Sequence, residues 1–249
     1  MLATSMHVAT FEPSPAAGQK QQTTILLVHG GALSHRMYKD VVPLLTGTYG
    51  YRVVTPDLPG HGESVSIGPF SFAASTRHLH DLIQRLRASD PNVQLVMAGI
   101  SLGGQAVLDF LAHHPEGVGA ALVSGAFIHP PDNGAARVLP KMPTEQSWLD
   151  MIQEDVAKVG MGNLPGIQNA SFGFTFKVPH ALLPPTLVVV GEHDMPTPLR
   201  DFDELSAEVK KASPKSESLV MIGAWHNHSI DVPEQFVEVL HAWIRKALP

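Results

Sequence analysis

A serine between two glycines is the first feature of this chain that could do chemistry. The run Gly99-Ile100-Ser101-Leu102-Gly103 follows an apolar segment, residues 93–98, and precedes residues 102–113, whose apolar residues have helical spacing. This context predicts a strand, a sharp turn and a helix, with Ser101 at the turn. Glycines without side chains allow backbone segments to approach closely there, and the helix N-terminus would direct N–H groups toward an oxyanion. The pattern favours a nucleophilic Ser101 over a serine in a plain glycine turn.

A second glycine turn could supply a donor to the same oxyanion. The run His29-Gly30-Gly31 ends an apolar segment, residues 24–29. An oxyanion site uses more than one donor, and removing one costs roughly 10²–10³ in rate. We predict that the backbone N–H groups of Gly31 and Leu102 form this oxyanion hole, and the alternative is an ordinary turn at a strand end.

Five motifs occur together along nearly the whole chain. They are HGG at 29–31, DLPGHGES at 57–64, GISLGG at 99–104, GEHD at 191–194 and GAWH at 223–226. In order and context they resemble the α/β-hydrolase superfamily, and within it the lidded branch of esterases, lactonases, C–C hydrolases and cofactor-free haloperoxidases. The resemblance implies an α/β fold with a mostly parallel central sheet flanked by helices and a small lid insertion. It also implies that Asp57, His61 and Ser64 brace a structural loop.

The resemblance implies that an acid and a base follow the serine in chain order. A serine needs a base to remove its proton, and the base needs an acid to fix its tautomer. Asp194 directly follows the apolar residues 186–190, whereas Glu192 lies inside the turn and Asp201 and Asp203 lie on the next predicted helix. We predict Asp194 as the acid. His226, in the family's Gly-x-Gly-His position, is the predicted base, with His228 as the alternative.

Residues 126–183 resemble the lid of this branch, and residues 1–125 and 184–249 form the predicted core. The lid segment is rich in apolar side chains and poor in basic ones, which favours an apolar small-molecule substrate over a phosphate. The alternative is that these side chains only pack the lid onto the sheet. The residues predicted to line a substrate pocket are Phe127, Trp148, Trp225 and His228. Of these, Trp225 stands where the family has glycine.

The elements that must position these residues follow from periodicity. Apolar runs alternate with longer amphipathic segments, which predicts a parallel sheet with crossover helices. Strands are predicted over residues 6–11, 24–29, 51–57, 93–98, 118–124, 186–190 and 218–222. Helices are predicted over residues 72–88, 102–113, 201–211 and 233–247.

Composition narrows the function classes further. The chain has 249 residues, 44% of them hydrophobic and 16% charged, with a net charge of -6, so no basic surface for nucleic acid is expected. It has no cysteine, which excludes disulfides and thiolate ligands. No histidine pair has the spacing of a helical zinc site, so we expect neither a catalytic metal nor a cofactor. The N-terminus lacks a signal-peptide pattern, and no window approaches the roughly 18 apolar residues of a membrane span.

Three functions are compatible with the sequence. The first is hydrolysis of a small, apolar carboxylic ester or lactone through an acyl-enzyme. The second uses the same triad to hydrolyse a C–C bond or to act as a perhydrolase. The third is a small-molecule binding protein without catalysis. For all three we expect a cytoplasmic monomer or homodimer whose partner is a small molecule and not a membrane.

Overall fold

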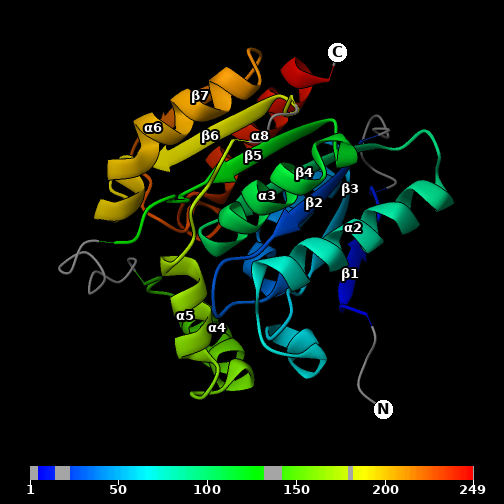
Figure 1. The fold of residues 1–249 in the computed structure, drawn as a ribbon. Coiled ribbons are helices and arrows are strands. Elements are labelled where there is room, and N and C mark those ends of the chain that lie inside the picture. Colours follow the sequence, from blue (N-terminus) through cyan, green and yellow to red (C-terminus); the bar gives the residue numbers. More distant parts are fainter. Residues whose placement is uncertain (1–4, 15–22, 132–141, 179–181, 249) are drawn as a thin grey trace.

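A single twisted sheet forms the centre of the computed structural model, which describes residues 5–14, 23–131, 142–178 and 182–248. In these residues seven strands follow the order β1-β3-β2-β4-β5-β6-β7, and only the β1–β3 pair is antiparallel (Figure 1). The strands are β1 (Val8–Phe11), β2 (Thr23–Val28), β3 (Arg52–Pro56), β4 (Gln94–Ile100), β5 (Ala120–Ser124), β6 (Thr186–Gly191) and β7 (Glu217–Met221). The predicted mostly parallel sheet is confirmed.

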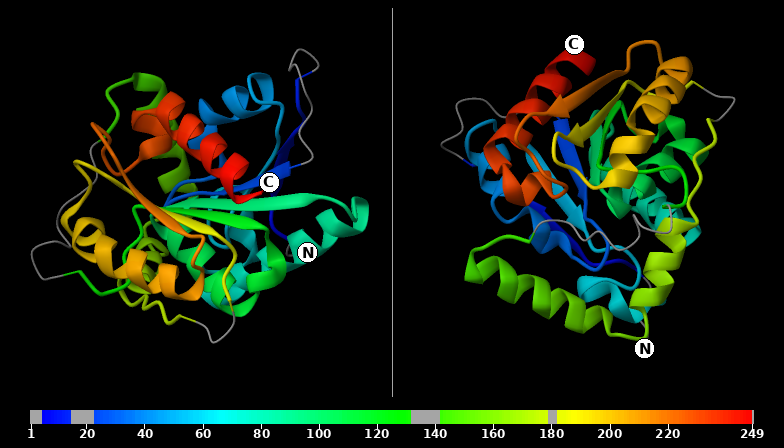
Figure 2. Two further views of the ribbon diagram at one scale, coloured as in Figure 1. Left: turned by 90° about the horizontal axis from the view of Figure 1, so that it is seen from above. Right: turned by 90° about the vertical axis from the view of Figure 1, so that its left-hand side faces the viewer.

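Helices cover both faces of the sheet (Figure 2, left). One layer consists of α2 (Phe72–Ser89), α3 (Leu102–His113) and α6 (Pro196–Ala212). The other consists of α1 (Val41–Gly47) and α8 (Pro233–Ala247), with the short α7 (His228–Asp231) beside α8. The strands between the layers are buried on both sides, which explains why their sequences are continuous apolar runs.

Strand β2 shows how one sequence fills two cores. Its side chains at Leu26 and Val28 join the cluster under α2, α3 and α6, whereas Ile25 and Leu27 join the cluster under α1 and α8. Successive side chains of a strand point to opposite faces, so a run of apolar residues supplies both clusters. All six residues of β2 are buried as a result.

Two further helices, α4 (Gln146–Val159) and α5 (Leu164–Phe172), lie together at one end of the sheet (Figure 1). Helix α4 buries Trp148, Met151, Asp155 and Val159, whose spacing of three and four residues places them on one face. Both helices belong to the predicted lid segment, of which residues 132–141 and 179–181 lie outside the described residues. The boundaries of the lid at 126 and 183 stay a prediction.

Most predicted elements agree with the structure to within two residues at each end, which is the usual uncertainty of helix boundaries. The exception is the start of α6. Helix α6 begins at Pro196, five residues before its predicted start, because proline is well tolerated in the first turn of a helix. Helix α1 was not predicted, since seven residues are too few for helical periodicity to show.

In the part of the chain that the structure describes, the remaining regular segments are three short 3-10 helices, η1 (His35–Tyr38), η2 (Gly62–Ile67) and η3 (Pro115–Gly117). Within the described residues, no helix combines the length and the apolar character needed to cross a membrane.

Candidate active site

Ser101 occupies the sharp turn between β4 and α3. Its backbone has φ 57° and ψ -122°, a left-handed conformation that side chains rarely adopt, and Ala32 is the only other such non-glycine position among the described residues. A residue held in this way stores roughly 1–3 kcal/mol of strain, which the surrounding structure must offset. The Ser101 N–H donates to Ser124 O at 2.8 Å, and the Gln105 N–H donates to Ser101 O at 3.0 Å. Ser101 is therefore fixed where β4 ends and α3 begins.

The glycines beside Ser101 are required by close backbone contacts. A Cβ atom on Gly99 would lie 2.3 Å from Gly103 O, and one on Gly103 would lie 2.1 Å from Val28 O. Neither contact is with a flexible side chain that could move away. Helix α3 thus packs directly on the ends of β2 and β4, which is the close approach that the glycines predict.

Asp194 and His226 form a buried hydrogen-bonded pair. Asp194 follows β6, and its Oδ1 lies 2.6 Å from His226 Nδ1. The Met195 N–H donates to the same oxygen at 2.7 Å, and the Gly191 N–H donates to Oδ2 at 3.3 Å. Burial by itself raises the pKa of Asp194, but the charge and hydrogen bond of His226 outweigh burial, so the pKa is lowered. Asp194 is therefore a carboxylate at neutral pH.

Gly125, for which the sequence made no prediction, lies directly against the Asp194–His226 pair. A Cβ atom there would lie 3.1 Å from two atoms of the His226 ring and 3.3 Å from Asp194 Oδ2. Gly125 directly follows Ser124, whose carbonyl binds the Ser101 N–H. Ser101 follows β4, Asp194 follows β6 and His226 follows β7, and Gly125 after β5 lies against the pair. That the three residues act together as a triad stays a prediction. A glycine immediately after an apolar strand run was the available signal for Gly125.

The loop after β2 lies beside the serine. A Cβ atom on Gly31 would lie 3.6 Å from the Leu102 side chain, and one on Gly30 would lie 3.8 Å from Ser101 Cβ. The Gly30 N–H is already bonded to Met37 Sδ at 3.3 Å. Gly31 and Leu102, the two predicted oxyanion donors, are therefore neighbours. Their role stays a prediction.

His228 lies behind Asp194 and is completely buried. Its Nδ1 hydrogen-bonds to Ser124 Oγ, and its Nε2 lies 3.8 Å from Asp194 Oδ2. Burial lowers the pKa of His228 to about 4, so the ring is neutral at pH 7. The expectation that His228 lines a substrate pocket does not fit this position, because a side chain without exposed surface cannot contact a ligand.

The other three predicted pocket residues lie in different places. Phe127 is buried after β5, and its ring centroid is 6.2 Å from that of Phe172 in α5. Trp225 is 38% exposed, and its ring lies 5.2 Å from His193 at the surface. Trp148 is buried in α4.

Trp148 packs against the segment that precedes α1. Its Nε1 donates to Asp40 Oδ2 at 3.2 Å, and Lys39 Nζ lies 4.2 Å from the ring centroid. These contacts fit the packing alternative for Trp148 better than a pocket role. They join the lid segment to the core.

The loop at 57–64 is held together by its own polar groups, as the resemblance implies. The Glu63 N–H donates to Asp57 Oδ2 at 3.0 Å, and His61 Nδ1 lies 3.0 Å from Pro59 O. Burial opposes ionisation of Asp57, but hydrogen bonds from His35 and Glu63, with the nearby His29, lower its pKa to about 2. Asp57 is thus a carboxylate at neutral pH, and its hydrogen bonds fix the conformation of this loop.

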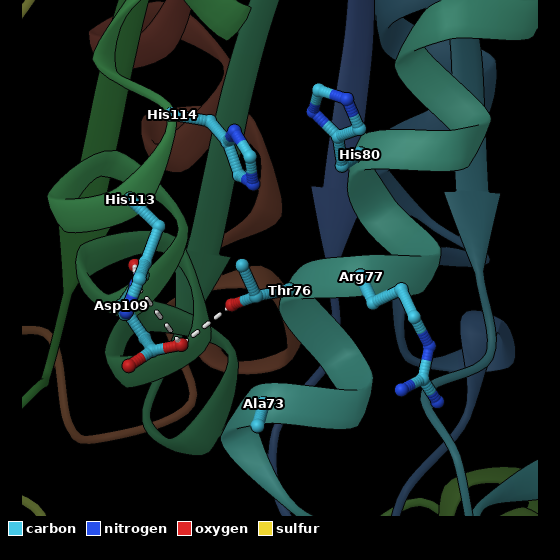
Figure 3. Close-up of a pocket in the computed structure, with 7 residues that line it drawn as sticks. All are labelled: Ala73, Thr76, Arg77, His80, Asp109, His113 and His114. Carbon is cyan, nitrogen blue, oxygen red and sulfur yellow. Dashed lines mark hydrogen bonds and ion pairs between the residues drawn. The ribbon is translucent and has the colours of Figure 1, made fainter.

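Two hollows in the described surface lie away from Ser101. One, of about 490 Å³, lies between α2 and α3 (Figure 3). There the rings of His80 and His114 stack at 4.1 Å, and Thr76 Oγ1 donates to Asp109 Oδ2 at 2.5 Å. The second, of about 540 Å³, is lined by residues of η1, α1 and α4. Neither is lined by Ser101, Asp194 or His226.

Sequence comparison relates the chain to hydrolases. The sequence model of the alpha/beta hydrolase family matches residues 25–239. A pyrethroid hydrolase of Sphingobium wenxiniae is 28% identical, over 88% of this chain and 86% of that protein. An AB hydrolase superfamily protein of Gibberella zeae is 36% identical over 44% of this chain, and a pimeloyl-[acyl-carrier protein] methyl ester esterase of Aromatoleum aromaticum is 35% identical over 45%. The chain spans only 37% and 42% of the length of these last two relatives.

Solved structures share the fold over almost the full length. A thermophilic esterase of Thermogutta terrifontis superposes with a TM-score of 0.72 at 22% identity, covering 98% of this chain and 95% of that one. A bromoperoxidase of Bacillus anthracis superposes with a TM-score of 0.67 at 18% identity, covering 96% of each chain. At these identities the likeness concerns the fold alone.

Proposed function

The chain belongs to the alpha/beta hydrolase family, and from this premise we propose that it is a serine hydrolase that cleaves a small, apolar carboxylic ester or lactone through an acyl-enzyme. Its esterase relatives support ester hydrolysis in general. The observation that carries the proposal is the buried 2.6 Å contact between Asp194 and His226 beside the strained turn of Ser101. Such strain persists where the surrounding structure imposes it, and it is common at reactive groups.

In the proposed reaction Ser101 Oγ attacks the carbonyl carbon of the ester while His226 Nε2 takes the serine proton. His226 Nδ1 faces Asp194, so its other ring nitrogen is the one left for the serine. The carboxylate of Asp194 stabilises the imidazolium that forms, without taking the proton itself. His226 then gives the proton to the leaving alcohol, and a water molecule hydrolyses the acyl-serine by the same route.

Negative charge develops on the carbonyl oxygen in both steps. The N–H groups of Gly31 and Leu102 are the proposed donors, since the two residues are neighbours and Leu102 opens helix α3. The positive end of the helix dipole adds to this stabilisation. The apolar side chain of Ile167 in α5 lies close to Gly31: a Cβ atom on Gly31 would be 3.6 Å from Ile167 Cγ2. This neighbourhood supports an apolar substrate.

The test is covalent labelling combined with turnover of short p-nitrophenyl esters. A fluorophosphonate probe should attach to Ser101 of the wild type, and Ser101→Ala should lose the label and at least about 10³-fold in kcat/KM. Ser147→Ala changes an exposed serine of α4 and is the matched control. This variant should keep both the covalent label and the esterase activity. An unlabelled wild type would instead favour a binding protein on the same fold. A product screen with 1,3-diketones, or with peroxide in acetate buffer, separates the C–C hydrolase and perhydrolase reactions.

A further inference from the structure

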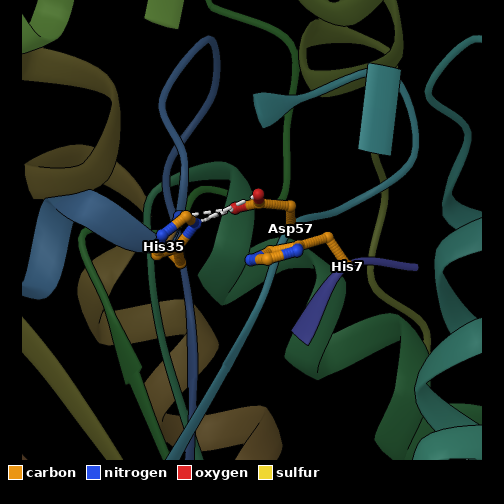
Figure 4. A group of neighbouring side chains, drawn as sticks. All are labelled: His7, His35 and Asp57. Carbon is orange, nitrogen blue, oxygen red and sulfur yellow. Dashed lines mark hydrogen bonds and ion pairs between the residues drawn. The ribbon is translucent and has the colours of Figure 1, made fainter. Parts of the chain in front are cut away.

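Two histidines and an aspartate from distant parts of the chain meet outside the candidate active site. His7 precedes β1, His35 opens η1 and Asp57 follows β3. One potential ligand atom from each side chain lies within 4.8 Å of the corresponding atoms of the other two. Figure 4 shows the His35 ring and the Asp57 carboxylate facing one another, with the His7 ring beside them. Local spacing in the sequence does not reveal this group, because its members are 22 or more positions apart.

The three side chains are close to the spacing that a metal ion requires. His35 Nδ1 lies 3.0 Å from Asp57 Oδ1 and 3.1 Å from Oδ2. The His7 and His35 ring centroids are 5.0 Å apart, with the rings tilted by 43°. A tetrahedral zinc ion with bonds of about 2.0–2.1 Å holds its ligand atoms about 3.4 Å apart. The His7 ligand atom, which lies within 4.8 Å of the other two, completes the third of the four positions when its ring turns toward the ion.

Backbone hydrogen bonds already hold the three residues in place. The Asp57 N–H donates to His7 O at 3.0 Å, and the His7 N–H donates to Ser64 Oγ at 2.8 Å. The His35 N–H donates to Asp57 Oδ1 at 2.6 Å. None of these bonds uses the imidazole nitrogens. A ligand set that is arranged before binding loses little conformational entropy when an ion arrives.

We propose that His7, His35 and Asp57 bind a divalent cation of the zinc type, with water as the fourth ligand. Two imidazole nitrogens and one carboxylate oxygen suit Zn²⁺, whereas Mg²⁺ and Ca²⁺ take oxygen ligands. Asp57 supplies the negative charge, and His35 carries its ring proton on Nε2 when the metal occupies Nδ1. The ion takes the place of the hydrogen bond that now joins His35 to Asp57.

The position of this site indicates a structural role. Its ligands join the segment before β1 to η1 and to the loop after β3. The residue before His35, Ser34, donates from Oγ to Asp155 Oδ2 of α4 at 2.7 Å, and Arg36 pairs with Glu154 of α4 at 2.7 Å. A bound ion would therefore hold the N-terminal strand and the contact surface of the lid helix in one arrangement. It would stabilise the fold without touching the reacting atoms.

The experiment is a calorimetric titration of the chelator-treated full chain with Zn²⁺, together with thermal melting. The wild type should bind one ion at this site, and at a free Zn²⁺ concentration roughly 100 times Kd its Tm should rise by about 5 °C. His7→Ala removes one ligand and leaves the backbone bonds in place, so it should fold and bind at least about tenfold more weakly.

His113→Ala is the matched control for the many histidines of this chain, because His113 is exposed beside the hollow of Figure 3. This variant should bind Zn²⁺ as the wild type does. Equal affinity of wild type and His7→Ala would overturn the proposal, as would a wild type that shows neither binding heat nor a change in Tm. Because melting reports on the ion directly, the outcome does not depend on whether the chain hydrolyses esters.

Discussion

Asp194 shows how a single side chain can organise a site. Its Oδ1 faces His226, its Oδ2 faces the Gly191 N–H, and His228 lies further away at 3.8 Å. A carboxylate so placed can only accept hydrogen bonds, so His226 must carry its proton on Nδ1. The remaining ring nitrogen is then available as a base toward Ser101. At the residue scale, the proposed chemistry depends on the acid's protonation state.

Replacing Asp194 by asparagine tests this dependence. The amide keeps the shape of the side chain but can donate a hydrogen bond, which favours the wrong tautomer of His226. We expect kcat for a p-nitrophenyl ester to fall by roughly 10⁴ while the far-UV spectrum is unchanged. Glu192→Gln alters a neighbouring carboxylate that binds the Gly223 N–H, and it should retain most activity. An active Asp194→Asn enzyme would remove Asp194 from the mechanism.

Helix α3 links the serine to the lid segment. One turn after Ser101, the completely buried Gln105 donates from Nε2 to Phe127 O at 3.0 Å and to Ser171 O at 3.1 Å. Its Oε1 accepts from Ser171 Oγ at 2.7 Å. The element that carries the nucleophile is thus bonded both to the segment after β5 and to α5. At this scale, close packing of α3 decides the geometry of the site.

Gln105→Leu removes this link with little change in volume. It leaves the buried Phe127 O without its Gln105 donor and the Ser171 hydroxyl without its acceptor, whereas Ser171 O keeps the Phe174 N–H. We therefore expect a loss of about 1–3 kcal/mol in the free energy of unfolding, measured in urea. Gln84→Leu, on the exposed face of α2, should change stability far less. Similar urea midpoints for the two variants would show that the Gln105 bonds contribute little.

Two glycines at helix positions should respond in opposite ways to alanine. In Gly103→Ala the new Cβ meets Val28 O at 2.1 Å, so α3 must move away from β2 and we expect a loss of about 3 kcal/mol or more. In Gly166→Ala of α5 no atom lies within 4 Å of the new Cβ. There the better helix propensity of alanine should stabilise the protein by up to about 1 kcal/mol. In thermal melting we expect a lower Tm than wild type for Gly103→Ala and a higher Tm for Gly166→Ala. A Gly103→Ala variant with the Tm of the wild type would show that α3 does not pack closely on β2.

At the scale of the whole molecule, the buried interior contains histidines that are neutral in the folded state. Burial lowers the pKa of His61 to about 3 and that of His228 to about 4, with the neighbouring His29 also disfavouring the charged form of His61. In the unfolded chain both take up a proton near the ordinary value of about 6.5. At a pH between the folded and the unfolded pKa values, the unfolded chain binds more protons than the folded chain. The free energy of unfolding is therefore highest above pH 6.5 and decreases as the pH falls toward 4.

Urea unfolding at pH 7 and pH 5 measures this loss. Each of the two buried histidines should cost the wild type about 2 kcal/mol of unfolding free energy over this interval. His228→Gln removes one titrating group, so its own loss between the same two pH values should be smaller by about 2 kcal/mol. If the variant lost as much as the wild type on acidification, His228 would not be a neutral buried group.

The sequence alone determined the features that depend on neighbours in the chain. Apolar runs predicted the buried strands, spacing of three and four predicted α2, α3 and α8, and the glycines beside Ser101 predicted the strained turn, because period and backbone freedom are local properties. Glycine-flanked motifs also carried the family resemblance. The short helix α1 and the first turn of α6 were not predicted, because the local patterns there are weak.

Only the tertiary structure decided which distant side chains meet. It placed His226 rather than His228 against Asp194 Oδ1, buried Trp148 against the segment before α1, and brought Gly125 to the His226 ring. It also assembled His7, His35 and Asp57 from three separate segments. These contacts depend on strand order and on the packing of loops at the carboxyl ends of the sheet. The local spacing of residues in the sequence does not contain that information, because residues far apart in the chain become neighbours only after folding.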